Sequence, residues 1–76
     1  MGERIERRVI KSEKGEQQIA TNLPYGIKTT YYPVEQYFEI WKKNNDMISM
    51  PAKSLEECEY YLHWFIDAIK YIHEFI

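Results

Sequence analysis

The chain has 76 residues, a mass of 9.3 kDa and a formal net charge of −2 at pH 7. Its single cysteine, Cys58, excludes an internal disulfide and favours a reducing compartment, while the short length leaves room for one domain with one small core. No apolar run is long enough to cross a membrane, and residues 1–11 lack the apolar segment of a secretory signal, so we expect a cytoplasmic protein.

A β-hairpin is expected at the start of the chain. Residues 4–11 alternate apolar and charged side chains, which predicts a strand whose basic residues suit the edge of a sheet. The turn is expected at residues 12–15, where Gly15 can adopt a positive φ. Residues 16–21 would then return as the second strand.

The third strand is expected at residues 27–32. This run is rich in β-branched and aromatic residues, the types that are enriched in strands. Asn, Pro and Gly within residues 22–26 separate it from the second strand, and Pro33 ends it.

Residues 33–43 have two interpretations. Their apolar side chains recur at helical spacing, and Pro33 is acceptable at the first position of a helix. Read with a period of two, Phe38 and Ile40 share one face of a strand. The Lys-Asn-Asn-Asp turn that follows, and the apolar residues beyond it, would complete a hairpin. We therefore favour strands at 36–42 and 47–50, and the helix stays open as the alternative.

A long helix is expected at residues 55–75. Ser54 and Glu57 form the sequence signature of a capping box, in which each side chain can bond a backbone amide of the first turn. Apolar residues then recur at spacings of three and four along one stripe, which the sheet should bury. These residues are Leu55, Cys58, Leu62, Phe65, Ile69, Ile72 and Ile76.

This order of elements predicts an α+β fold. A small antiparallel sheet of four to five short strands would be followed by one long C-terminal helix that packs across one face of the sheet. The whole chain, residues 1–76, is expected to form a single domain.

The sequence contains no recognisable catalytic, cofactor or metal site. His63 and His73 are ten residues apart and point roughly 80° away from one another on a helix, so they cannot share a metal ion. Cys58 lies on the apolar stripe, which is typical of a buried small hydrophobe rather than of a nucleophile. We therefore expect a protein that is not an enzyme and that uses no cofactor and no metal.

A row of aromatic residues lies beside the apolar stripe. Tyr60, Trp64 and Tyr71 recur at spacings of four and seven, and Phe75 lies nearer the stripe on the same side. A small sheet covers a stripe only a little over roughly 100° wide, so we expect the row to stay exposed. The alternative is that strand edges and residues 22–26 cover it.

An exposed aromatic row favours a protein-interaction module. Tyr and Trp are preferred anchors of protein interfaces, and a core this small is often stabilised by a partner chain. The row would dock onto a partner protein or onto a second copy of the chain as a homodimer. The expected role is that of an adaptor or inhibitor, and a chain of this size would also suit a phage or another mobile element.

The second hypothesis is that the sheet binds single-stranded nucleic acid while the helix forms a dimer. Aromatic rings and positive charges mix along the predicted strands, as they do on single-strand-binding surfaces. The candidate residues are Arg7, Arg8, Lys11, Lys28, Tyr31, Trp41 and Lys42. Interleaved glutamates leave residues 1–53 with a net charge of only +2, against −4 for residues 54–76. An ordinary mixed-charge sheet surface is therefore the alternative.

Overall fold

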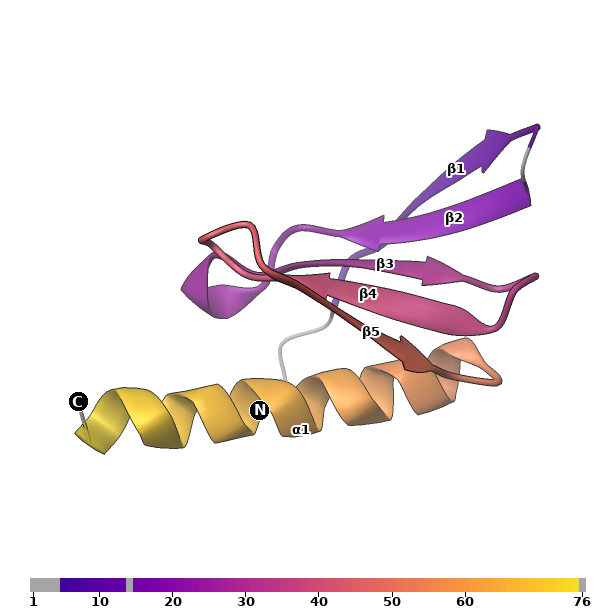
Figure 1. Ribbon diagram of the computed structural model, residues 1–76. Helices are drawn as coiled ribbons and strands as arrows, with labels where there is room; N and C mark the ends of the chain where they lie inside the picture. Colours follow the sequence, from indigo (N-terminus) through magenta and orange to yellow (C-terminus); the bar gives the residue numbers. More distant parts are fainter. Residues whose placement is uncertain (1–4, 14, 76) are drawn as a thin grey trace.

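The computed structural model describes residues 5–13 and 15–75, without the side chains of Ser12 and of residues 73–75. A five-stranded antiparallel sheet, in the order β1-β2-β3-β4-β5, lies on one side of a single long helix, α1 (Figure 1). The strands are β1 (Arg8–Ser12), β2 (Gly15–Ala20), β3 (Lys28–Tyr32), β4 (Tyr37–Trp41) and β5 (Met47–Pro51), and α1 is Leu55–Phe75. The predicted α+β class, with its antiparallel sheet and C-terminal helix, is confirmed.

The segment with two interpretations forms a strand. Residues Tyr37–Trp41 pair with β3 on one side and with β5 on the other, and Phe38 and Ile40 are fully buried. A period of two places these two side chains on the same face of the sheet, so the strand buries both. The helical alternative for residues 33–43 is therefore wrong.

Residues with positive φ allow the tight connections between strands. Gly15 has a φ of 114° and pairs with Ser12 across the predicted β1–β2 turn. Asn45 has a φ of 71° in the β4–β5 turn, where the Asn44 side chain accepts a hydrogen bond from the amide of Asp46 at 3.1 Å. Asn tolerates this conformation better than most residues. Between β2 and β3 the chain makes one 3-10 turn, Pro24–Gly26.

The first strand is shorter than predicted. It begins at Arg8, and residues 5–7 are not part of the sheet. Instead, Ile5 packs against the hydrophobic core, and Arg7 bonds to the helix. Arg4, the predicted first residue of the strand, lies outside the described residues.

The core lies between one face of the sheet and the first half of α1. Tyr31, Phe38 and Ile40 from the strands meet Cys58 and Leu62 from the helix, and all five are at most 2% exposed. The Tyr31 hydroxyl donates a hydrogen bond to the Ala52 carbonyl at 3.2 Å, which satisfies its only polar group.

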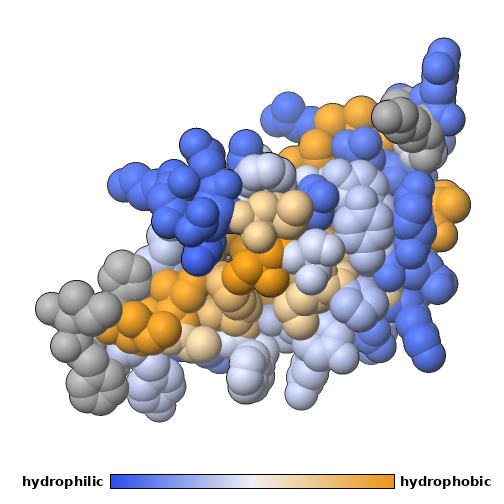
Figure 2. Space-filling view, in the orientation of Figure 1, coloured by the Kyte–Doolittle hydropathy of each residue, from blue (hydrophilic) through white to orange (hydrophobic). Residues whose placement is uncertain are grey.

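The helix is longer than the sheet that covers it. Figure 1 shows its C-terminal end extending past the strands, and Ile72, predicted to be buried, is 56% exposed. Ile66 packs against the core in its place, although its predicted position is beside the stripe. In Figure 2 an apolar band runs between sheet and helix and continues along the uncovered end. Ile76, the last residue of the predicted stripe, lies outside the described residues.

Candidate docking surface on the helix

The start of α1 is fixed by the predicted capping residues. The amide of Glu57 donates to Ser54 Oγ at 3.1 Å, as a capping box requires. The Glu57 carboxylate accepts from the amide of Lys53 at 3.1 Å, one residue earlier than the usual reciprocal bond. These bonds fix where the helix begins, and therefore which side chains face the sheet.

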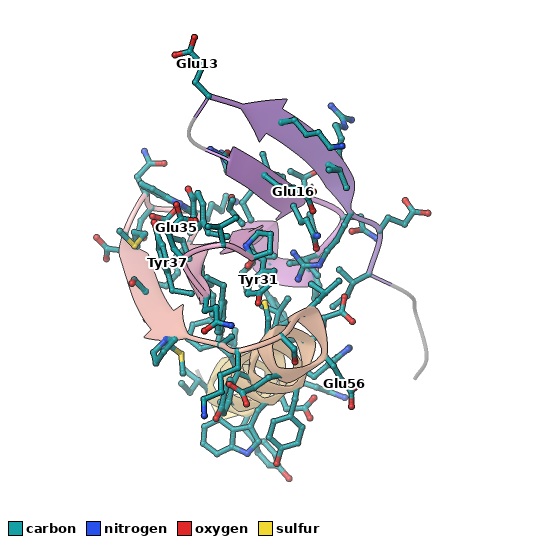
Figure 3. All side chains as sticks on the ribbon, turned by 90° about the vertical axis from the view of Figure 1, so that its right-hand side faces the viewer. Glu13, Glu16, Tyr31, Glu35, Tyr37 and Glu56 are labelled. Carbon is teal, nitrogen blue, oxygen red and sulfur yellow. The ribbon has the colours of Figure 1, made fainter. Side chains whose placement is uncertain are left out.

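The aromatic row of α1 lies on the side of the helix away from the sheet. Tyr60, Trp64 and Tyr71 are 68%, 71% and 66% exposed, whereas Cys58 and Leu62 are fully buried. At about 100° per residue the three aromatic residues fall within about 40° of one another. Figure 3, which looks along the helix, shows aromatic rings projecting from this side. We call Tyr60, Trp64 and Tyr71 the outer row.

Strand edges and the loop at 22–26 do not cover the outer row, so that alternative is wrong. The row also lies farther from the core than predicted, because it is nearly opposite the buried stripe rather than beside it. The side chain of Phe75, the fourth predicted member, lies outside the described residues.

Tyr61 connects the outer row to the core. Its ring stacks against Phe38 with a centroid distance of 6.4 Å, and Tyr60 meets it edge-on at 5.7 Å. The position of Tyr60 at the start of the row is therefore set by a ring that packs on the core.

A shallow recess opens at the N-terminal end of the outer row. It has a volume of about 400 Å³ and is lined by Ser54, Glu56, Glu57, Tyr60 and Tyr61. Two carboxylates and two tyrosine rings therefore share one concave surface. Sequence reasoning missed this recess because it considered the acidic residues and the aromatic residues as separate groups.

The candidate nucleic-acid residues do not gather on one surface. Tyr31, predicted as an aromatic platform, is buried in the core, and the prediction is wrong because its position in β3 faces the helix. The Arg7 side chain is only 7% exposed and pairs with Glu59 at 3.3 Å, while it also donates to the Gln18 carbonyl at 3.1 Å. Arg7 is therefore a structural residue rather than a surface contact.

Three of the remaining members share the open face of the sheet, and two lie elsewhere. Alternation along the strands places Arg8, Lys28 and Trp41 on the face away from the helix, and Lys11 on the opposite face. Lys42 lies 3.9 Å from the Asp46 carboxylate in the β4–β5 turn. Arg8 also lines a recess of about 380 Å³ that extends from β1 to residues 21–22.

An acidic residue occupies the centre of the open sheet face. Glu39 accepts hydrogen bonds from the Tyr32 hydroxyl at 3.1 Å and from Trp41 Nε1 at 3.4 Å. Tyr32 and Tyr37 stack beside it with ring centroids 4.6 Å apart. This cluster was not predicted as a site, although a period of two through β4 aligns Tyr37, Glu39 and Trp41. Its carboxylate weakens the case for phosphate binding at this face.

Cys58 is held in its protonated form. Burial raises the pKa of the Cys58 thiol to about 11, although the nearby Arg7 guanidinium acts in the opposite direction. The sulfur accepts a weak hydrogen bond from Arg7 at 3.7 Å. Within residues 5–13 and 15–75, no three His, Cys, Asp or Glu side chains gather in a way that could hold a metal ion.

No protein-family model, curated protein or solved structure matches this chain. In the described part of the chain, α1 is too polar to qualify as a membrane-crossing helix.

Proposed function

We propose that the protein is a small, non-enzymatic protein-interaction module, an adaptor or inhibitor, that docks through the outer row of α1. One observation carries the proposal: Tyr60, Trp64 and Tyr71 project together from the side of the helix that the fold does not use. The compartment that fits a single reduced cysteine is the cytoplasm.

The energetics favour an interface at this surface. Large aromatic side chains contribute most to protein–protein affinity when a partner removes them from water. The fold gains little from keeping these three rings on the surface, because the core is already formed by Leu62, Cys58 and the strands. A partner that covers the row would bury this apolar area without disturbing the core.

A nucleic-acid function has weaker support. Of the seven candidate residues, Arg7 and Tyr31 are used inside the fold, and Lys11 and Lys42 lie away from the open face of the sheet. Only Arg8, Lys28 and Trp41 share that face. On that face Glu39 accepts a hydrogen bond from Trp41 Nε1, which places a negative charge where single-strand binding needs positive charge beside a ring.

The experiment compares two variants whose replaced side chains are similarly exposed in the wild-type chain. Trp64→Ala combined with Tyr71→Ala removes the outer row, and Val34→Ala is the control because Val34 is 72% exposed in the β3–β4 turn. Association is measured by sedimentation for the chain alone and by affinity capture from host lysate. We expect the double variant to weaken association by about thirtyfold or more, as for a hot spot, while the control binds normally.

Two controls make this result interpretable. The unfolding free energy of the double variant should change by no more than about 0.5 kcal/mol per site, because both side chains are exposed. The proposal would be contradicted if the wild-type chain stays monomeric at high concentration and the double variant captures every protein that the wild type captures.

A further inference from the structure

The recess at the N-terminal end of the outer row has its own chemistry. Glu56 and Glu57 supply two carboxylates, and Tyr60 and Tyr61 supply two rings in an edge-to-face arrangement at an angle of 65°. Because Tyr61 packs against Phe38 and Tyr60 remains 68% exposed, one ring is fixed and the other is open to a ligand.

The two carboxylates have different roles. Glu57 caps the helix through its bond to the Lys53 amide. Glu56 is exposed, and within the described part of the chain it forms no hydrogen bond or ion pair. Figure 3 shows Glu56 projecting from the helix at its N-terminal end, on the opposite side of the molecule from Glu13.

The recess is negative despite its place at a helix N-terminus. The first turn of a helix carries the equivalent of roughly +0.5 charge, which two carboxylates outweigh. A negative recess with an exposed aromatic face suits an organic cation, since the cation can contact both the carboxylate and the ring. A guanidinium group fits best because it is planar and can pair with a carboxylate while it stacks on a ring.

We propose that this recess receives an arginine or lysine side chain of the partner protein. The inference rests on the proposed docking function, and it specifies the partner: a basic residue followed by an apolar surface that covers Trp64 and Tyr71. Along the helix axis, Tyr60 and Tyr71 are about 16 Å apart, so the apolar part of the partner must span at least that length.

The charge of the helix favours a different protein over a second copy as the occupant. Glu56 and Asp67 are both exposed, and helical spacing places Asp67 on the same side of α1 as the outer row. Two copies paired through this face would bring like charges together, which is unfavourable at neutral pH. A basic partner instead neutralises this face.

The test uses N-acetyl-arginine amide as the probe and N-acetyl-glutamine amide as its neutral counterpart. Each is titrated into the full chain, and binding is followed by the ¹H–¹⁵N signals of residues 56–61. We expect the arginine probe alone to shift these signals, and Glu56→Gln to weaken its binding by about two- to fivefold, as for an exposed ion pair. Glu13→Gln, the matched control at the distant hairpin, should bind as the wild type does.

The outcomes separate this inference from the proposed function. Equal shifts with both probes, or unchanged arginine binding by Glu56→Gln, would overturn the inference even if the outer row binds a partner. Self-association that depends on Trp64 and persists in excess arginine amide would also overturn it, since the occupant would then be a second copy. Whether the outer row binds a partner at all is tested separately, by the Trp64→Ala, Tyr71→Ala variant.

Discussion

Arg7 and Arg8 are adjacent in the sequence and have opposite environments. Arg8 begins β1 with an exposed side chain, whereas Arg7 lies against the helix, where it pairs with Glu59 and donates to the Gln18 carbonyl. The Arg7 guanidinium thus joins three elements: the N-terminal segment, β2 and α1. This ion pair is partly buried, and removal of one partner leaves the other without its bonds.

Arg7→Ala should destabilise the fold by about 1–3 kcal/mol, because hydrogen bonds to a buried charged group are lost. Arg8→Ala is the matched control and should change stability by no more than about 0.5 kcal/mol. Urea unfolding followed by circular dichroism measures both values. Equal stabilities of the two variants would show that Arg7 does not connect the sheet to the helix.

Tyr32 makes the stability of the folded chain depend on pH. Burial raises the pKa of the Tyr32 hydroxyl to about 12, and the hydrogen bond to Glu39 and the charge of Glu39 act in the same direction. The unfolded chain loses this proton near pH 10, so the folded state holds it more tightly. The stability that Tyr32 contributes is therefore complete below pH 10 and is lost as the pH rises from 10 towards 12.

Unfolding experiments between pH 9 and pH 12 should show this loss, and ultraviolet absorbance should show a tyrosine that titrates late. Glu39→Gln removes a negative charge, so it should lower the pKa of Tyr32, although not to the ordinary value because burial remains. If every tyrosine titrates near pH 10 in the folded wild-type chain, both the burial of Tyr32 and its hydrogen bond to Glu39 are contradicted.

At the scale of the element, the two ends of α1 differ in their contribution to stability. Leu62 is fully buried against the sheet, whereas Ile72, ten residues later, extends beyond it. Leu62→Ala should therefore cost about 2–5 kcal/mol, enough to unfold a domain of this size. Ile72→Ala should cost less than about 1 kcal/mol. Thermal unfolding of both variants tests this contrast, and similar melting temperatures would contradict it.

The elements themselves could be predicted from local patterns. Gly15 and Pro33 mark turns, the capping residues mark the start of α1, and a period of two identifies β4. What local patterns do not contain is how far the sheet extends over the helix. Ile72 has the correct spacing for the stripe, but the strands end before they reach it.

The face of the sheet on which each side chain lies was also harder to predict than the strands themselves. Tyr31 and Tyr32 are identical in type, and only the register of β3 against the helix decides which one is buried. Arg7 has a long charged side chain, which usually indicates the surface. Its burial depends on Glu59, which is 52 residues away in the sequence, so no local pattern could indicate it.

At the scale of the whole molecule, the two opposite sides of α1 have different environments. One side completes the core with the sheet, and the other presents the outer row and the acidic recess. Since the two sides share few residues, variants of the outer row can test binding without loss of the fold. This separation is what makes the proposed function experimentally accessible.

The most direct measurement is site-specific photo-crosslinking from the outer row. A benzophenone amino acid replaces Trp64 in one variant and Val34 in the other, two residues of nearly equal exposure. After irradiation in host lysate, our account predicts a discrete crosslinked product from position 64 that is absent from position 34. Excess unlabelled wild-type chain should compete for the partner and reduce that product. An equal excess of the Trp64→Ala, Tyr71→Ala variant should leave the product unchanged. Crosslinks of equal yield from both positions, or none from position 64, would contradict the assignment of the outer row as the docking surface.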